Sequence, residues 1–320
     1  MTAPIDVSII IVSYNVKDYL LGCIASIRQY ATAISHEIIV VDNGSQDGSV
    51  MALEGLQPGI TVVANRENAG FAGAVNAGFS LSSGDYILLL NPDTLLKDRS
   101  IDCVLEFMRS TPSAGIATCR VVDADGSPQK IVQSFPAVSR NIARALFIDR
   151  LSPENRRRYY YRDSPVRVDF VSGAFMLIRR SALPPGPLLN PDYFMYAEEK
   201  DLSLRLRKAG RRTWFVPQGE IVHFGGRSTA LTPLPMFLEL QKSQAKFYLN
   251  HYSVLHALAL CMSWWLVLIA ETAVSLPLLI LAGGRTRLSL FAHAAGLFPG
   301  YALSLFTSRR RAGALPMVQP

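Results

Sequence analysis

The sequence predicts an α/β protein with a mostly parallel central sheet, followed by an apolar helical region. Four strand-forming runs, each bounded by polar or turn-forming residues, indicate buried strands at 7–12, 36–41, 60–64 and 86–90. Segments with helical spacing of apolar residues separate these runs, and this alternation favours right-handed crossovers and parallel pairing. Residues 254–282 and 288–306 together carry a single charge, which predicts a separate apolar region.

The remaining elements follow in order along the chain. Further helices are expected at 17–30, 68–81, 100–109 and 197–208. One more helix is expected after 36–41, with Asp47 or Ser49 as its N-cap. Further strands are expected at 115–120, 168–179, 213–216 and 220–224. Gly173 lies in the middle of the second of these strand patterns, and Pro217 separates the last two. A hairpin is expected over 121–132, with its turn at Asp125-Gly126.

The functional interpretation depends most on Asn91-Pro92-Asp93-Thr94. This stretch follows a buried strand, and Pro92 is expected to break the ladder and turn the chain outward. Asp93 is therefore expected at the carboxyl end of a central strand, the edge at which open α/β sheets bind ligands. A carboxylate there suits a divalent cation that bridges phosphate oxygens, because Mg2+ and Mn2+ prefer oxygen ligands. The same residues also fit a plain turn with an exposed aspartate.

Two other polar stretches follow predicted strands. Asp42 opens the stretch 42–49, where it can accept hydrogen bonds from a nucleobase or ribose, or form an ordinary turn before a helix. In the stretch 65–73, small residues at a helix start suit a position beside a ligand, and Arg66 is a candidate for contact with phosphate or base. This stretch is not a G-x-G-x-x-G pattern, so it does not support a dinucleotide fingerprint.

Titratable residues gather in two stretches nearer the C-terminus. Three carboxylates crowd the start of the helix expected at 197–208. They either complement the helix dipole or, beside a metal–diphosphate site, include a general base toward a hydroxyl. His223 ends a predicted strand and precedes two glycines and an arginine, which suits a segment that ligates a metal or contacts phosphate. A purely structural histidine is the alternative.

Composition favours anionic partners and a reducing compartment. The net charge is +7 and the pI about 9.3, a balance that suits nucleotide diphosphates, nucleic acid or acidic lipid surfaces. The four cysteines are widely spaced, with no C-x-x-C pair, which argues against a zinc site or a disulfide framework. The first residues lack the basic region of a signal peptide.

The segment 140–167 is strongly basic, with eight arginines against three acids and three consecutive tyrosines. It fits a solvated loop, or a nucleic-acid surface with interleaved aromatics. The apolar C-terminus favours a third interpretation, contact with anionic lipid headgroups or with a lipid-diphosphate acceptor. We therefore expect a membrane partner and no nucleic-acid partner.

Two apolar segments follow in the last quarter of the chain. Residues 254–282 carry one charge over 29 residues, and residues 288–306 carry none over 19. Both reach the length of a membrane helix, roughly 20 residues. A hairpin across the bilayer would place Arg285 and Arg287 outside, against the usual charge bias. Helices lying in the membrane interface avoid this cost and are the arrangement we expect.

Seven stretches of the chain form a recognisable set. They are Val-Ser-Ile-Ile-Ile-Val-Ser-Tyr-Asn at 7–15, Val-Val-Asp-Asn-Gly-Ser-Gln-Asp-Gly-Ser at 40–49, Glu-Asn-Ala-Gly-Phe-Ala at 67–72, Leu-Leu-Leu-Asn-Pro-Asp-Thr at 88–94, Val-Ser-Gly-Ala-Phe-Met-Leu at 171–177, Tyr-Phe-Met-Tyr-Ala-Glu-Glu-Lys-Asp-Leu at 193–202 and Val-His-Phe-Gly-Gly at 222–226. In this order they resemble the family 2 inverting glycosyltransferases of bacterial surface-polysaccharide assembly, most nearly the rhamnosyltransferase-like subgroup. The resemblance covers about residues 6–250. It implies a GT-A fold, the Rossmann-like fold of nucleotide-diphospho-sugar transferases, with a nucleotide-sugar donor and a divalent cation, Mg2+ or Mn2+.

The resemblance implies roles for single residues. Asp42 matches the aspartate that contacts the nucleotide, and Asp93 matches the last acid of the metal-binding D-x-D motif, whose first position here is Asn91. Glu199 matches the second acid of a Glu-Asp pair, the usual catalytic base. It is one methylene longer than the aspartate of that pair, so Glu198 stays as an alternative base. The other residues expected at the donor or the metal are Ser13, Asn15, Arg66, Asn68, Gly70, Gly173 and, as a metal contact, His223.

The predicted function is transfer of a sugar, with rhamnose as a candidate, from a nucleotide-diphosphate donor to a lipid-diphosphate-linked or glycan acceptor, with inversion. We expect a catalytic domain over 1–250 and a membrane-associating region over 251–320, at the cytoplasmic face of the cell membrane. A sugar nucleotidyltransferase is one rival, but it would need a Gly-rich phosphate loop after the first strand, and residues 13–16 are not one. A non-catalytic membrane-bound scaffold is the other, and metal-dependent donor hydrolysis distinguishes it.

Overall fold

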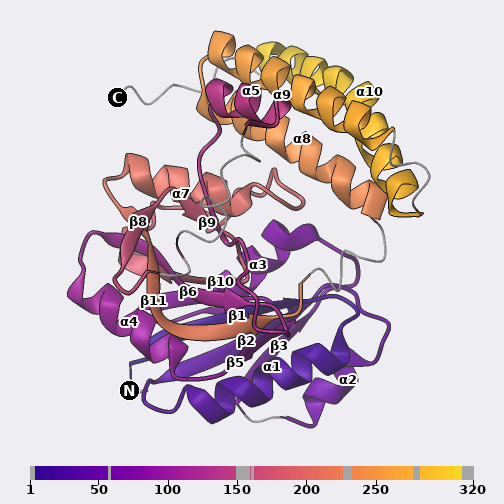
Figure 1. Ribbon diagram of the computed structural model, residues 1–320. Coiled ribbons are helices and arrows are strands. Elements are labelled where there is room, and N and C mark those ends of the chain that lie inside the picture. The colour runs from indigo at the N-terminus through magenta and orange to yellow at the C-terminus, as the bar shows by residue number, and fades with distance from the viewer. Residues whose placement is uncertain are drawn as a thin grey trace. The chain divides into compact units, whose positions relative to one another are not determined.

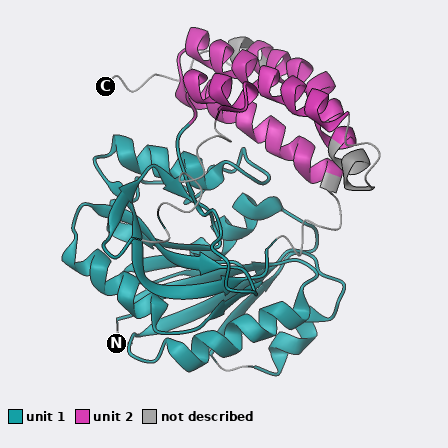
Figure 2. Ribbon diagram, viewed as in Figure 1, with its two compact units in different colours: residues 1–135, 154–231 teal, residues 136–153, 232–320 magenta. Residues whose placement is uncertain are grey.

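The computed structural model describes residues 4–56, 59–148, 159, 162–225, 233–276 and 282–311. The chain divides into two compact units, residues 1–135 with 154–231, and residues 136–153 with 232–320 (Figure 2). This division differs from the boundary expected at residue 250, because the helix before that residue groups with the apolar C-terminal helices. The first unit contains the sheet, and the second consists of helices.

The first unit is built on a mixed sheet, which in the described part of the chain has nine strands in the order β3-β2-β1-β4-β10-β6-β11-β5, with β8 paired to β11 (Figure 1). Its strands are β1 (Val7–Ser13), β2 (His36–Asp42), β3 (Ile60–Ala64), β4 (Tyr86–Leu90), β5 (Thr94–Leu96), β6 (Ala114–Val122), β8 (Val166–Val168), β10 (Phe175–Arg179) and β11 (Arg212–His223). Strands β3, β2, β1 and β4 are parallel, and β10 lies antiparallel between β4 and β6. The predicted α/β class and the parallel N-terminal half of the sheet are confirmed.

Helices pack on this sheet, as the alternating pattern predicted. They are α1 (Lys17–Tyr30), α2 (Ser49–Glu54), α3 (Gly70–Leu81), α4 (Ser100–Ser110), α7 (Glu198–Lys208) and the short 3-10 helix η2 (Arg180–Ala182). The central strands are mainly apolar, and both of their faces are covered: Ile9, Ile10 and Leu88 are at most 1% exposed. Full burial of such a side chain contributes roughly 1.5–3 kcal/mol. The small residues of α3 allow close packing, since a Cβ added at Gly78 would lie 2.8 Å from Ile10 Cγ2.

The single strand predicted over 168–179 is wrong. The chain forms three strands there, β8, β9 (Phe170–Val171) and β10, and each has different partners: β8 pairs with β11, β9 with β7 (Val132–Gln133), and β10 with β4 and β6. Asp169 interrupts the pattern because its carboxylate accepts the Phe135 N–H at 3.0 Å. Gly173 consequently lies in the turn between β9 and β10, outside the strands.

The two strands predicted at 213–216 and 220–224 are one strand, β11, which pairs with β6 on both sides of an irregular stretch. Pro217 has no N–H for the ladder, and Gly219 has a φ of +92°, so the ladder is interrupted while the strand continues.

The hairpin predicted over 121–132 forms only in part. A tight turn does form, in which Asp123 N–H donates to the Ser127 carbonyl at 2.8 Å. The returning chain pairs with β6 only beside this turn, where Pro128 lies opposite Val122 and the Gln129 N–H donates to the Val121 carbonyl at 2.9 Å. Farther along, Val132 lies opposite Val171 in the small second sheet.

The second unit consists of α5 (Val138–Ala145), α8 (Pro233–His251), α9 (Val254–Ser275) and α10 (Ala282–Arg311). Among the described residues, two stretches are long and apolar enough to cross a membrane, Val254–Ser275 with 22 residues and Leu288–Thr307 with 20. At about 1.5 Å per residue they reach roughly 33 and 30 Å, against a bilayer core of about 30 Å. Exposed large apolar side chains recur at every third or fourth residue of α9: Leu255, Leu258, Met262, Leu266 and Ile269. We call these five residues the α9 stripe.

Two adjacent tryptophans of α9 form hydrogen bonds to other helices of the second unit. Pro299 has no N–H to donate to the Ala295 carbonyl one turn earlier. Trp265 Nε1–H donates to this carbonyl at 2.8 Å, and Trp264 Nε1–H donates to Gln241 Oε1 at 2.7 Å. The two adjacent tryptophans therefore tie α9 to α10 and to α8.

Candidate active site

The carboxyl ends of β1, β2, β4 and β11 lie at the same edge of the large sheet. Strands β1, β2 and β4 are parallel, β10 is antiparallel to both β4 and β6, and β11 is parallel to β6, so β11 runs in the same direction as β4. Ser13, Asp42 and His223 end their strands, and Asn91 follows β4 directly. These expected site residues therefore share the edge at which open α/β sheets bind ligands.

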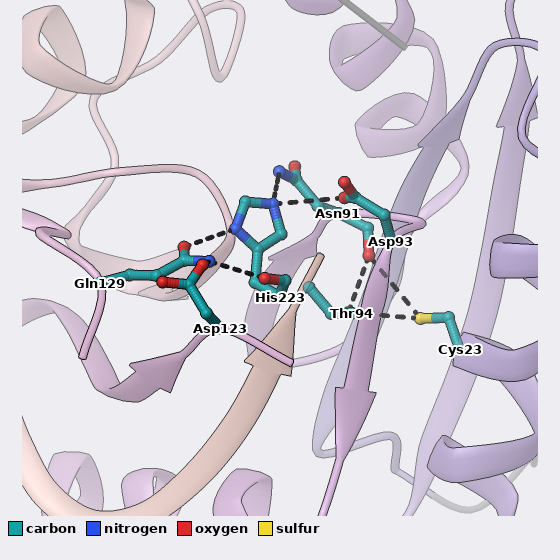
Figure 3. A network of polar contacts seen from close by, with 7 residues as sticks. All are labelled: Cys23, Asn91, Asp93, Thr94, Asp123, Gln129 and His223. Atoms are coloured by element: carbon teal, nitrogen blue, oxygen red, sulfur yellow. Dashed lines mark hydrogen bonds and ion pairs between the residues drawn. The ribbon is translucent and has the colours of Figure 1, made fainter. Parts of the chain in front are cut away.

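Asp93 and His223 come together because the chain re-enters the sheet after Pro92. The outward turn predicted there is wrong: the next residues form β5, antiparallel to the end of β11, with Thr94 opposite His223. Asp93 Oδ1 lies 3.2 Å from His223 Nε2, and both side chains are largely buried. Asn91 Nδ2 lies 3.1 Å from the same nitrogen (Figure 3).

The Asp93–His223 pair fits part of a divalent cation site. A carboxylate oxygen and a neutral imidazole nitrogen are both ordinary ligands of divalent metals. Cis ligands of an octahedral cation with bonds of about 2.1 Å lie about 3.0 Å apart, close to the 3.2 Å between Oδ1 and Nε2. Within the described ranges, no three or more His, Cys, Asp or Glu side chains gather in a group that could hold a metal. Any cation here would therefore take its other ligands from phosphate oxygens and water, as Mg2+ usually does.

Cys23 lies next to this pair, but its thiol is not suited to bind a metal. Its Sγ is 3.5 Å from Thr94 Oγ1 and 3.7 Å from the Asn91 carbonyl oxygen (Figure 3). Burial raises the pKa of Cys23 to about 12, and metals bind the thiolate. The thiol thus packs beneath the turn as a neutral group.

Asp42 combines a structural and a potential binding role. Its Oδ2 accepts the backbone N–H groups of Gly44 and Ser45 at 3.2 and 2.9 Å, which makes the turn that the sequence also allowed. Its Oδ1 is buried and has no hydrogen-bond partner among the described residues. A buried carboxylate oxygen without a donor is costly, so this atom is suited to accept a hydrogen bond from a bound nucleotide.

The loops after β1 and β2 are locked together beside Asp42. Asn15 has a φ of +53°, its N–H donates to Ser45 Oγ at 2.9 Å, and its Oδ1 accepts the Gln46 N–H at 2.7 Å. Ser13 lies opposite Asp42 in the sheet, and its hydroxyl is buried with no partner in the described structure. The expected donor residues of the first strand are therefore neighbours of Asp42.

The expected contact residues after β3 mainly connect loops. Asn68 Oδ1 accepts from Asn43 Nδ2 at 2.8 Å and from the Gly70 N–H at 2.9 Å. Gly70 has a φ of +74°, and a Cβ there would overlap the Phe194 carbonyl. Only glycine therefore lets α3 start against the loop that precedes α7. Arg66 is exposed in the same loop.

Glu199 is held at this edge by the loop before β10. Its Oε1 accepts the Gly173 N–H at 3.0 Å, and a Cβ at Gly173 would lie 2.9 Å from that oxygen. The next residue, Ala174, accepts the Asn91 N–H at 3.2 Å, which links Glu199 to the Asp93–His223 pair. The preceding Tyr196 and Ala197 both have positive φ, near +70°, an uncommon strained backbone for residues other than glycine.

Burial sets the protonation of the acids in α7. It raises the pKa of Glu199, and it raises the pKa of Glu198 well above its usual range, with a further contribution from the Glu199 charge. Glu198 is 2% exposed and its Oε2 has no partner within the described ranges, whereas Glu199 is partly accessible. Burial also lowers the pKa of Lys200 to about 8. The third acid, Asp201, pairs with Arg205 at 2.8 Å.

Sequence reasoning missed two neighbours of His223. Gln129 Oε1 lies 2.8 Å from His223 Nδ1, and Gln129 Nε2 donates to Asp123 Oδ1 at 2.7 Å. No local motif marks either residue. The only available signal was the turn pattern, and it says nothing about a partner 94 positions away along the chain.

Two predicted binding segments lie partly outside the described residues. These parts are residues 226–230, after His223, and residues 149–158, 160 and 161 of the basic segment 140–167. The guanidinium of Arg144 lies 5.2 Å from the ring centre of Trp264, inside the second unit. Contact of the basic segment with lipid or acceptor stays a prediction.

Comparison with known proteins adds family information to this geometry. The sequence model described as glycosyl transferase family 2 matches residues 8–184. An N-acetylglucosaminyl-diphospho-decaprenol L-rhamnosyltransferase of Mycobacterium tuberculosis is 28% identical over 273 residues, which cover 80% of this chain and 85% of that protein. Rhamnosyltransferase WbbL of Escherichia coli is 29% identical, over 68% of this chain and 83% of that protein.

Among solved structures, the mannosyltransferase PcManGT from Pyrobaculum calidifontis, in complex with GDP-Man and Mn2+, superposes with a TM-score of 0.57. The alignment covers 92% of this chain and 87% of that chain at 18% sequence identity. The expected GT-A fold is confirmed by this likeness.

Proposed function

This chain belongs to glycosyl transferase family 2, and we propose that it transfers L-rhamnose from a nucleotide-diphosphate donor to a polyprenyl-diphosphate-linked acceptor, with inversion. The names of the two relatives above support the sugar, and that of the mycobacterial relative supports the acceptor class. The product would be a lipid-linked precursor of a cell-surface glycan.

One observation supports the proposal most: three acidic residues lie at one edge of the sheet, where each suits a different task in the reaction. Asp42 has a buried oxygen without a hydrogen-bond partner among the described residues, so it can accept a hydrogen bond from the nucleotide. Asp93 and His223 offer ligands for a cation, and the Gly173 N–H holds Glu199 beside them. The reaction needs a contact for the nucleotide, a cation at its diphosphate and a base at the acceptor hydroxyl, and these three groups must lie next to one another.

Glu199 is the proposed general base. Gly173 N–H holds one carboxylate oxygen, so the other oxygen is left to take the proton from the acceptor hydroxyl. The deprotonated oxygen then attacks the sugar from the face opposite the diphosphate, which inverts the anomeric carbon in one displacement. Glu198 is less suited to this task, because burial raises the pKa of its carboxyl well above the usual range and so favours the neutral form.

Asp93 and His223 are the proposed ligands of Mg2+ or Mn2+, which when bound would neutralise charge on the departing diphosphate. Asn91 lies beside the pair, with its Nδ2 3.1 Å from His223 Nε2. Asp42 and Ser13 would contact the nucleotide, and Gly173 would lie beneath the sugar.

The second unit is the proposed membrane anchor. We propose that its helices lie in the cytoplasmic interface, with the α9 stripe facing the acyl chains, because this keeps nearby arginines at the headgroups. An Arg285→Cys variant should then resist a membrane-impermeant thiol reagent applied outside the cell. Labelling from outside would favour a hairpin across the bilayer instead.

A direct test of the activity uses purified full-length protein, a polyprenyl-diphosphate N-acetylglucosamine acceptor and a panel of nucleotide sugars, with and without Mn2+. The proposal predicts metal-dependent transfer of rhamnose with inverted anomeric configuration. Transfer of another sugar alone would overturn the donor assignment, and metal-independent transfer would overturn the cation's role.

A further inference from the structure

The hydrogen bonds around His223 give a role to the turn that the sequence analysis expected as a hairpin. We propose that Gln129, held by Asp123, is a positioning residue that fixes the tautomer of His223, so that Nε2 is the nitrogen presented to the cation. The inference rests on the proposed metal–diphosphate site, and it concerns two residues to which neither the motifs nor that proposal gave a role.

The orientation of the Gln129 amide follows from the atoms around it. Its Nε2 lies 2.7 Å from Asp123 Oδ1 and 2.6 Å from the backbone carbonyl oxygen of His223. An ionised carboxylate and a carbonyl can only accept hydrogen bonds. A reversed amide would place Oε1 against both acceptors, so the NH2 group must occupy this side. Oε1 then faces His223 Nδ1, at 2.8 Å (Figure 3).

This orientation determines the tautomer of His223. Because Gln129 Oε1 can only accept, Nδ1 must carry a hydrogen. In a neutral imidazole the lone pair then resides on Nε2. Nε2 is the nitrogen that lies 3.2 Å from Asp93 Oδ1 and 3.1 Å from Asn91 Nδ2. Without a cation, the Asn91 amide can donate to the Nε2 lone pair. If a cation were bound, the Nε2 lone pair and the Asp93 carboxylate would both be available to it.

Backbone and side-chain contacts keep this support rigid. Asp123 Oδ2 accepts from Ser127 Oγ at 3.0 Å, and Asp123 N–H donates to the Ser127 carbonyl at 2.8 Å. The Gln129 N–H donates to the Val121 carbonyl of β6 at 2.9 Å. The turn therefore holds both side chains under the imidazole. Such outer partners orient a ligating histidine, and their loss typically weakens metal binding by about 10–100-fold.

The tautomer is measurable without any metal. In protein labelled with 15N-histidine at about pH 8.5, roughly two units above the ordinary histidine pKa, long-range 1H–15N spectra distinguish a protonated from an unprotonated ring nitrogen. The His223→Gln variant identifies the His223 signals among the five histidines. We expect hydrogen on Nδ1 and none on Nε2, and a mixture of tautomers in Gln129→Met. Hydrogen on Nε2 in the wild type, whether alone or on both nitrogens, would overturn the proposal.

Metal affinity provides the second readout. Gln129→Met keeps the length of the side chain but removes its acceptor, and Gln133→Met is the matched control, because Gln133 is exposed on β7. With a nucleoside diphosphate present, Mn2+ binding followed by electron paramagnetic resonance should weaken about 10–100-fold in Gln129→Met and stay unchanged in Gln133→Met. The same substitution made in the His223→Gln background should have no further effect, since Gln129 acts through His223.

The outcomes separate this inference from the proposed function. Wild-type protein that binds no Mn2+ with any nucleoside diphosphate would overturn the proposed metal site, whatever the tautomer. Wild-type protein that binds Mn2+, with equal affinity in Gln129→Met, would overturn the role of Gln129 alone. A loss in Gln129→Met that persists at full size in the His223→Gln background would show a structural effect and would also overturn it.

Discussion

Replacement of Glu199 by glutamine should remove the proposed base and leave the site in place. The glutamine Oε1 can accept the Gly173 N–H as Glu199 Oε1 does at 3.0 Å, so the side chain should keep its position. The amide cannot take up a proton, and general-base catalysis is typically worth about 10²–10⁴-fold. At about 1.36 kcal/mol per factor of ten, this is roughly 3–5 kcal/mol of activation free energy. We expect kcat to fall by that factor while the Kd of the donor is unchanged.

The pH profile gives a second readout of the same substitution. Burial raises the pKa of Glu199, and a base acts only in its deprotonated form. Wild-type kcat/KM should therefore rise with pH through this raised pKa and level off above it. The Glu199→Gln variant should lack this rise.

Glu198→Gln is the matched control, since it makes the same change one residue earlier on a side chain that is 2% exposed. For both variants, kcat is measured from initial rates at saturating donor, and the Kd of the donor is measured by calorimetry. A larger loss of kcat in Glu198→Gln than in Glu199→Gln would show that the base is misassigned. Full activity in Glu199→Gln would refute the mechanism.

Three further predictions concern stability. Gly70→Ala should lower Tm more than Gly48→Ala, because both positions have positive φ but an added Cβ meets a neighbour only at Gly70; equal losses in thermal unfolding would contradict this. Trp265→Phe leaves the Ala295 carbonyl without its 2.8 Å donor and should cost about 1–3 kcal/mol in detergent-solubilised protein; an unchanged unfolding curve would refute it. Burial raises the pKa of Glu198 in the folded state, so the wild type loses free energy of unfolding as pH rises above about 4.3, the ordinary glutamate pKa. Glu198→Gln should therefore raise the free energy of unfolding by an amount that grows with pH. A gain that shrinks with rising pH in denaturant titrations would contradict the raised pKa.

The parallel half of the sheet was predictable because its signals are local. The runs that became β1, β2 and β4 are largely buried on both faces, so nearly continuous apolar sequence marks them, and the polar residues after them mark the edge. Asp42 and Asn91 were placed correctly at that edge for this reason.

The contacts that complete the site were not predictable, because short segments far apart in sequence make them. Strand β5 has three residues, and its pairing with the end of β11 alone brings His223 beside Asp93. The pattern over 168–179 alternates like one strand, yet its pieces pair with different partners. No local pattern encodes such a choice of partner.

The central claim is that Asp93 joins a cation to a nucleotide diphosphate, and calorimetric titration tests it most directly. Nucleoside diphosphates are titrated into the wild type, Asp93→Ala and Asp18→Ala, each with and without Mn2+; Asp18 is exposed on α1 and serves as the matched control. The fold should survive in Asp93→Ala, because the backbone carbonyl of Asp93 still accepts the Phe224 N–H at 2.9 Å. We expect Mn2+ to tighten nucleotide binding in the wild type and in Asp18→Ala, and to have no effect in Asp93→Ala. Equal tightening by Mn2+ in Asp93→Ala would contradict it.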